Sequence, residues 1–274
     1  NEEENNDKDK EKAKQASKFA KSIKRKQANS DLTLDQFGTN LNQAALSGAF
    51  EGFYGREDEI KKILKILSSK DAPNPILIGT PGTGKTAIME QIAKRIAFGR
   101  VPKCLLNHVV YSIDVNGMVA DTVYRGQLEA KIKNLINAAS KARNVILFID
   151  EIHMLRTAGD SMDSQSLFMN SFKPAMLSGM FKLAGATTLS EFETAFSKDD
   201  AFTSRTQKVD IPDLTKEQII KIINAKTPVY EQFHGVTFNK DHSALIYDLA
   251  ERFLPDKYFP RKALMVLDHI LTEE

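Results

Sequence analysis

The 274-residue sequence contains a single cysteine, Cys104, and no tryptophan. One cysteine excludes an internal disulfide framework and a cysteine-ligated metal site, so we expect a reducing, cytoplasmic compartment. No apolar run is long enough to span a membrane, and the charged N-terminus lacks the apolar segment of a secretory signal peptide. The net charge of +2 is too small to indicate nucleic-acid binding by itself. The first residue is not methionine, so we expect a processed product or part of a longer protein.

The strongest local signal is a glycine-rich stretch that fits the phosphate-loop pattern G-x-x-x-x-G-K-[ST] at every required position. It consists of Gly79, Thr80, Pro81, Gly82, Thr83, Gly84, Lys85 and Thr86. The apolar residues 75–78 before it predict a buried strand, and residues 87–96 after it have the pattern of a helix. In that setting the glycines let the backbone wrap phosphates, while the loop amides and the helix N-terminus face their negative charge. The alternative is a plain glycine-rich turn.

Four side chains have predicted roles towards ATP and Mg²⁺. Lys85 can reach the β- and γ-phosphates, and the Thr86 hydroxyl can ligate Mg²⁺. Residues 145–149 predict a strand buried on both faces, and Asp150 and Glu151 follow it. Asp150 is then placed to hold the Mg²⁺ shell, directly or through water, and Glu151 to polarise a water against the γ-phosphate. The alternative is a core strand that ends in two solvated carboxylates.

The chain divides into three segments by composition. Residues 1–31 are rich in Asn, Glu, Asp and Lys, which predicts a charged, disordered tether. A helix that orders on a partner or an arm that binds nucleic acid are alternatives for this segment. Residues 32–212 alternate strands with helices, which predicts an α/β domain with a parallel sheet and helices on both faces. Residues 213–274 show only helical periodicity and predict a small helical lid domain.

Ligands of parallel α/β sheets bind at the carboxyl ends of the strands. Gly79, Asp150 and Thr188 all lie at the ends of predicted strands, so we expect them to meet around one nucleotide. Thr188 has a simpler alternative interpretation as the cap of the next helix. The five histidines show no metal-ligand spacing, and we interpret all of them as structural or exposed.

Taken in order, these motifs resemble the first ATPase domain of the Clp-type AAA+ unfoldases and disaggregases, the ClpA, ClpB and ClpC group. The resemblance extends from Leu34 to Leu271. Besides the phosphate loop and the strand before Asp150, it is carried by Phe53-Tyr54-Gly55-Arg56-Glu57, Tyr124-Arg125-Gly126, Lys173-Pro174-Ala175, Gly185-Ala186-Thr187-Thr188 and Pro260-Arg261-Lys262-Ala263.

The resemblance implies a homo-oligomeric ring, expected to be a hexamer, that hydrolyses ATP and threads polypeptide substrates. Thr188 matches sensor 1, a hydroxyl that orients the attacking water. Tyr124 matches the pore-loop aromatic that grips a polypeptide in the central channel. Arg205 matches an arginine that reaches the γ-phosphate of the neighbouring subunit, where a guanidinium stabilises the transferring phosphoryl group. Considered alone, Tyr124 is also compatible with a packing role and Arg205 with a solvated one.

The resemblance further implies nucleotide contacts from Phe53 and Tyr54, in a cradling segment, and from Arg261 in the lid. This chain departs from the group at the residues that precede Arg205 and Tyr124. Ser204 stands where the group usually has the first of two adjacent arginines, and Val123 precedes the pore tyrosine where a basic residue is common. The group's folded N-terminal domain, coiled middle domain and second ATPase ring are not found in these residues.

These departures keep other functions open beside a ring-forming, Mg²⁺-dependent protein remodeller. One alternative is a nucleotide-gated scaffold, a subunit of a larger assembly joined through the tether, which binds partners without threading them. Another is a motor or loader that acts on nucleic acid through the basic residues 8–26. No basic surface interleaved with aromatic residues supports this last alternative, so nucleic acid is not the expected partner.

Overall fold

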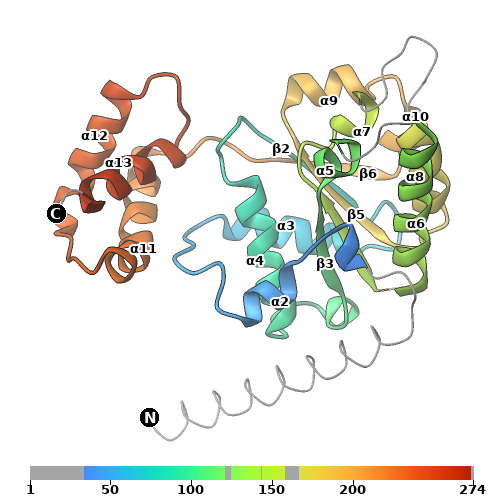
Figure 1. The fold of residues 1–274 in the computed structure, drawn as a ribbon, viewed down its shortest axis with the longest axis horizontal. Helices are drawn as coiled ribbons and strands as arrows, with labels where there is room; N and C mark the ends of the chain where they lie inside the picture. The colour runs from blue at the N-terminus through green and yellow to red at the C-terminus, as the bar shows by residue number, and fades with distance from the viewer. Residues whose placement is uncertain (1–33, 121–124, 143, 158–166, 273–274) are drawn as a thin grey trace, which may run out of the picture.

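The computed structural model describes residues 34–120, 125–142, 144–157 and 167–272 (Figure 1). Within these residues the centre is a six-stranded sheet with the strand order β1-β3-β4-β5-β2-β6. The strands are β1 (Gly38–Asn40), β2 (Asn74–Ile78), β3 (Val109–Ile113), β4 (Val145–Ile149), β5 (Lys182–Thr187) and β6 (Thr206–Asp210). All pairs of neighbouring strands among β2, β3, β4, β5 and β6 are parallel, which confirms the predicted α/β fold.

The edge strand β1 departs from the prediction of a parallel sheet. It pairs antiparallel with β3, with Gly38 opposite Ile113 and Asn40 opposite Tyr111. Its three residues show no apolar alternation, so the sequence pattern does not reveal a strand there. Gly38 is needed for this pairing, because a Cβ atom at that position would lie 2.0 Å from the carbonyl oxygen of Ser112.

Helices cover both faces of the sheet (Figure 1). The helices α3 (Glu57–Leu67) and α4 (Lys85–Ala97) pack on one face. The helices α6 (Arg125–Ala142), α8 (Leu167–Leu177) and α9 (Leu189–Phe196) pack on the other face. Shorter described elements are η1 (Leu34–Gln36), α2 (Leu41–Leu46), η2 (Lys103–Leu105), α5 (Val115–Ala120), α7 (Met154–Thr157) and α10 (Asp200–Thr203).

The strand β4 is apolar at every position because helices cover it on both faces. Ile146 and Phe148 pack in the core shared with α3 and α4, whereas Leu147 and Ile149 pack in the core shared with α6 and α8. Successive side chains of a strand point to opposite faces, so a strand covered by helices on both sides is apolar at every position. This burial holds β4 rigidly and fixes where Asp150 and Glu151 emerge.

The C-terminal helices form a body with a core of its own, beside the sheet (Figure 1). They are α11 (Lys216–His234), α12 (Ser243–Phe253) and α13 (Arg261–Thr272), with the short η3 (Lys240–His242) between the first two. Its fully buried residues include Ile219, Ile223, Ile246, Ala263 and Leu267. The predicted helical lid is therefore present, while the exact segment boundaries after residues 31 and 212 stay predictions. None of the described helices has the length and apolar character required to cross a membrane.

Candidate functional site

The glycine-rich stretch connects β2 to α4 at the carboxyl edge of the sheet. Gly82 and Gly84 have φ angles of 80° and 90°, a region that side-chain-bearing residues rarely adopt. Gly79 is required by space instead, because a Cβ atom there would lie 2.8 Å from the carbonyl oxygen of Ile211. The loop therefore follows a path that these glycines make possible, and its amides at the start of α4 stay available to a ligand.

Lys85 is buried at the start of α4, with 6% of its surface exposed. Its Nζ donates hydrogen bonds to the carbonyl oxygens of Gly79 at 2.9 Å and Thr80 at 3.0 Å. Both partners are neutral, so they do not cancel the ammonium charge. A cation beside the N-terminus of a helix favours an anionic ligand such as a phosphate group. Pro81 completes the loop at the rim, and Thr83 closes it with a hydrogen bond from Oγ1 to the Thr80 carbonyl at 2.9 Å.

Thr86 and Asp150 meet although they lie on different elements and 64 residues apart. The Thr86 Oγ1 donates a hydrogen bond to Asp150 Oδ2 at 2.5 Å. This contact brings a hydroxyl and a carboxylate oxygen together beside the phosphate loop. Two oxygen ligands of these kinds, with phosphate oxygens to complete the shell, are the donor set that Mg²⁺ prefers. The residues present therefore fit the predicted cation.

Glu151 is held in an unusual backbone conformation directly after β4. Its φ angle is 51°, which for a non-glycine residue costs of order 1 kcal/mol or more and is often found at functional sites. Partial burial, then the neighbouring carboxylates of Asp150 and Glu191, raise the pKa of Glu151 above its usual value. The side chain is 48% exposed. A partly solvated carboxylate with a raised proton affinity, close to Lys85, is suited to take a proton from water.

Four side chains lie around Glu151 in an arrangement that the sequence pattern does not reveal. Together with Glu151 they form what we call the Glu151 cluster: Glu151, His153, Thr187, Thr188 and Glu191. Within it, ligand atoms of Glu151, His153 and Glu191 all lie within 4.8 Å of one another. The interpretation of His153 as merely structural or exposed thus missed its place beside Glu151. The cluster joins residues from the end of β4, the end of β5 and the first turn of α9, which no local spacing shows.

Thr188 forms the N-cap of α9 and belongs to a capping box. Its Oγ1 accepts a hydrogen bond from the Glu191 amide at 3.3 Å and donates one to Glu191 Oε2 at 2.7 Å. Partial burial on its own raises the pKa of Glu191, but hydrogen bonds from Thr188 and Thr187 outweigh this and lower the pKa. The capping alternative for Thr188 is therefore observed, and its predicted role towards water stays a prediction.

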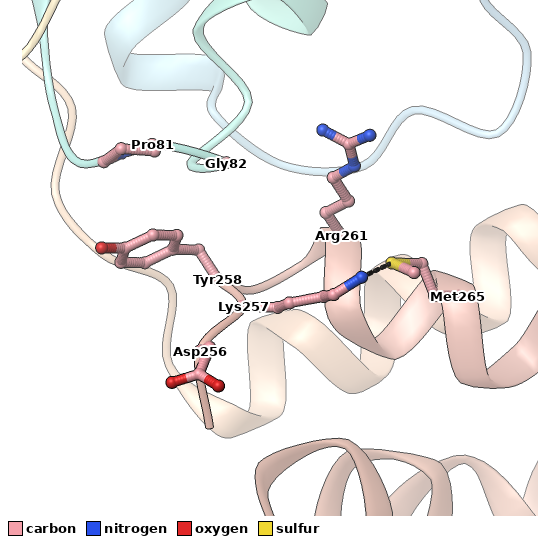
Figure 2. Close-up of a pocket in the computed structure, with 7 residues that line it drawn as sticks. All are labelled: Pro81, Gly82, Asp256, Lys257, Tyr258, Arg261 and Met265. Carbon is pink, nitrogen blue, oxygen red and sulfur yellow. Dashed lines mark hydrogen bonds between the residues drawn. The ribbon is translucent and has the colours of Figure 1, made fainter. Parts of the chain in front are cut away.

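The lid closes one side of the loop (Figure 2). A cavity of about 330 Å³ lies between them, lined by Pro81, Gly82, Asp256, Lys257, Tyr258, Arg261 and Met265. Pro81 and Gly82 face Tyr258 across this cavity, and Arg261 points from the first turn of α13 towards the α/β domain (Figure 2). Arg261 is thus on the wall shared with the phosphate loop.

The predicted cradling segment runs between the α/β domain and the lid. Phe53 packs partly buried against the core of α3 and α4. Tyr54 is exposed, and Lys221 Nζ of α11 lies 6.0 Å from the centroid of its ring. Next to them, Arg56 donates a hydrogen bond from Nη2 to the Thr83 carbonyl of the loop at 3.1 Å. The segment is therefore tied to both the lid and the phosphate loop.

One predicted site residue, Arg205, lies apart from this site, and a second has no described position. Arg205 precedes β6 and is exposed at the opposite edge of the sheet, where Thr206 is paired with Asn74 at the start of β2. Tyr124 lies outside the described residues.

Comparison with known families agrees with this geometry. Residues 75–209 match the ATPase family associated with various cellular activities (AAA), and residues 215–273 match the AAA lid domain. The chain belongs to the AAA ATPase family. The first match includes the phosphate loop and the Asp150–Glu151 pair, and the second covers the three long lid helices.

The similar proteins include a ClpB chaperone and an ATP-binding subunit of a Clp protease. The chain is 40% identical over 237 residues to the chaperone protein ClpB of Bacteroides thetaiotaomicron, covering 86% of this chain and 27% of that protein. It is 40% identical over 243 residues to the ATP-dependent Clp protease ATP-binding subunit ClpE of Bacillus subtilis, covering 89% and 34%. The chain therefore spans about a third or less of these relatives.

Solved structures give the same result for this AAA domain. The Hsp104–ADP complex of S. cerevisiae is 34% identical with a TM-score of 0.78, covering 86% of this chain and 40% of that one. The extended Hsp104:casein complex is 33% identical with a TM-score of 0.77, covering 88% and 41%. The predicted Clp-type AAA+ fold is confirmed.

Proposed function

We propose that this AAA domain is the ATP-hydrolysing unit of a ring that remodels protein substrates. The observation that supports this most directly is the meeting of Lys85, Thr86, Asp150 and Glu151 at one edge of the sheet, with Thr86 and Asp150 in direct contact. Relatives named as a ClpB chaperone and a Clp protease subunit, and an Hsp104 complex with casein, support protein as the substrate.

In the proposed reaction, Lys85 and the amides at the start of α4 bind the β- and γ-phosphates of ATP. Thr86 and Asp150 hold Mg²⁺, which when bound offsets negative charge on the transferring phosphoryl group. Glu151 orients a water molecule and draws off its proton as the water oxygen attacks the γ-phosphorus. The bond between the γ-phosphorus and the bridging oxygen to the β-phosphate breaks, so that ADP and inorganic phosphate are released. Thr188 orients the same water; because its proton is donated to Glu191, its oxygen acts as the acceptor.

The remaining contacts to nucleotide are proposed from the two sides of the site. Phe53 and Tyr54 cradle the base on the side of α11, and Arg261 approaches the phosphates from α13. The exposed ring of Tyr54 and the position of Arg261 on the cavity wall support these roles. Arg261 supplies positive charge from the lid, so hydrolysis and lid position are coupled.

The assembly is proposed to be a hexameric ring in the cytoplasm. Arg205 lies too far from its own phosphate loop to serve it, which supports action on the nucleotide of a neighbouring copy. Tyr124 is proposed to grip the polypeptide in the pore. The tether of residues 1–31 is proposed to connect the ring to a larger assembly.

The decisive test of hydrolysis is Glu151→Gln, measured by phosphate release and by retention of radiolabelled ATP. We expect this variant to bind ATP and to lose turnover by about a hundredfold or more, because the amide cannot accept the proton. The matched control is Glu193→Gln, an exposed carboxylate on α9 that faces no site residue in the contacts described. Turnover by Glu151→Gln equal to that of the parent contradicts the assignment.

Remodelling is tested separately with Tyr124→Ala. We expect ATP hydrolysis to continue and the unfolding of a fluorescent protein substrate to stop. Tyr124→Phe keeps the aromatic ring and is expected to keep activity. Full unfolding by Tyr124→Ala removes the threading proposal and leaves the ATPase proposal intact.

A further inference from the structure

The Glu151 cluster ties the carboxylate after β4 to a rigid helix cap. His153 is central to it: its Nδ1 lies 3.4 Å from Glu151 Oε2, 3.4 Å from Glu191 Oε2 and 3.0 Å from Thr187 Oγ1. The His153 side chain is only 17% exposed, against 48% for Glu151. The more buried member of the pair is therefore the imidazole, and the more exposed one is the carboxylate.

The hydrogen-bond pattern determines which proton His153 carries. Thr187 Oγ1 has one proton, and it donates to Glu191 Oε2 at 3.0 Å. Thr187 Oγ1 is then an acceptor towards His153 Nδ1. Two carboxylate oxygens also flank Nδ1, and a nitrogen lone pair facing them would be repelled. His153 therefore carries its proton on Nδ1 and donates it to Thr187 Oγ1, while Glu151 Oε2 lies 3.4 Å from the nitrogen of the same N–H group.

Glu191 anchors this arrangement. Its Oε2 accepts hydrogen bonds from the Thr188 amide at 3.0 Å, the Thr188 hydroxyl at 2.7 Å and the Thr187 hydroxyl at 3.0 Å. Thr187 is fully buried at the end of β5. Glu191 is consequently fixed by the sheet and by the start of α9 together, and its charge holds the His153 N–H group in place.

We propose that His153 is a positioning residue that aims the Glu151 carboxylate, with Glu191 as the group that fixes His153. The inference rests on the proposed ATP hydrolysis and assigns a specific support to its base. Glu151 has a left-handed backbone conformation and a half-exposed side chain, so its own rotamer preferences do not settle its direction. The His153 N–H supplies that direction, and it links the position of Glu151 to the end of β5.

The test compares four substitutions at two positions in the full chain, under conditions in which the parent hydrolyses ATP. Asn places its amide nitrogen where His153 has Nδ1, whereas Gln places it where His has Nε2. We therefore expect His153→Asn to keep most of the parent kcat. We expect His153→Gln and His153→Ala to lose about 10- to 100-fold in kcat, because a misaimed catalytic group costs rates of that order. Glu191→Gln keeps the capping box and is expected to lose activity through weaker support of His153.

The readouts separate positioning from a structural role. The dissociation constant of a fluorescent ATP analogue and the KM are expected to stay within about twofold in all four variants, because binding groups are untouched. Thermal unfolding midpoints are measured beside them, so that a fold effect is seen directly. In a Glu151→Gln background, His153→Ala is expected to cause no further loss, since residues that act as a unit are not additive.

Each outcome has a distinct meaning. Equal kcat for His153→Ala and the parent, while Glu151→Gln is inactive, overturns the positioning role and leaves the proposed function standing. Equal losses in His153→Asn and His153→Gln overturn the Nδ1 assignment on which the proposal rests. A further loss from His153→Ala in the Glu151→Gln background shows that His153 acts elsewhere. Equal activity of the parent and the Glu151→Gln variant overturns the assignment of Glu151 as the base, and with it the positioning role of His153. A parent that hydrolyses no ATP refutes the proposed function itself.

Discussion

Arg56 offers a sharp test of how the phosphate loop is held. It ends the segment before α3 with a φ angle of 62°, and its side chain is 6% exposed. Its guanidinium donates to the Thr83 carbonyl at 3.1 Å and to Glu59 Oε1 at 3.0 Å. Arg56 therefore connects α3 to the backbone of the loop.

The expected cost of Arg56→Ala follows from these contacts. Losing a hydrogen bond from a charged donor to the loop carbonyl costs about 1.5–3 kcal/mol. Leaving Glu59, which is 18% exposed, without its partner adds a further penalty for an unpaired carboxylate. We expect the free energy of unfolding to fall by about 3 kcal/mol in total. Nucleotide affinity is expected to fall as well, because the loop must then be ordered by the ligand.

The assay is urea unfolding followed by circular dichroism, with and without ATP. The matched control is Lys61→Ala, which removes another i, i+3 ion pair of the same helix. That pair joins Lys61 to Asp58 at 3.6 Å with side chains 70% and 96% exposed, so its loss is expected to cost less than about 0.5 kcal/mol. An Arg56→Ala variant as stable as Lys61→Ala refutes the reasoning that burial gives the Arg56 pair its value.

Three further outcomes are expected. Burial, followed by the charge of Lys182, lowers the pKa of His108 from 6.5 to about 4, so between those pH values the unfolded chain binds a proton that the folded chain does not. Stability should therefore fall as the pH drops from 6.5 to 4 and should not depend on His108 above 6.5; His108→Gln should flatten this part of a Tm-against-pH curve. Gly82→Ala should weaken ATP binding more than Gly84→Ala, because both have positive φ but only a Cβ at Gly82 meets the Tyr258 Cβ, at 3.0 Å. Phe172→Ala should lower the free energy of unfolding by about 3–5 kcal/mol, since the ring is fully buried edge-on against Phe181.

The sequence predicted the strand, loop and helix around residues 79–86 because these elements are local. Strand, glycine loop and helix follow one another within residues 74–97, and each has a periodicity of its own. The place of Asp150 and Glu151 at the end of a strand was predicted for the same reason, because a strand buried on both faces has a continuous apolar sequence. Gly79 and Asp150 were expected at one edge because parallel strands end at a common edge, and the contact between Thr86 and Asp150 lies at that edge.

What the sequence did not predict depends on contacts between distant segments. Glu191 reads locally as the last residue of a capping box, and only the packing of β5 beside β4 brings it near His153. The three-residue β1 is too short for any pattern, and it is recognised only by its pairing with β3. Arg56 was noted only as part of the cradling motif, and its hydrogen bond to the Thr83 carbonyl is known only from the structure.

The position of Arg205 carries the argument for assembly. The strand β2 runs from Asn74, beside Arg205, to Ile78, directly before the phosphate loop. Five residues at about 3.3 Å each separate the two edges by roughly 16 Å, further than an arginine side chain extends. The register is fixed by five residue pairs between β2 and β6, so no local shift brings the guanidinium to its own loop. If Arg205 contributes to hydrolysis, it must do so at the phosphate loop of another copy. Hydrolysis then requires an interface in which the Arg205 end of one copy lies against the phosphate loop of the next.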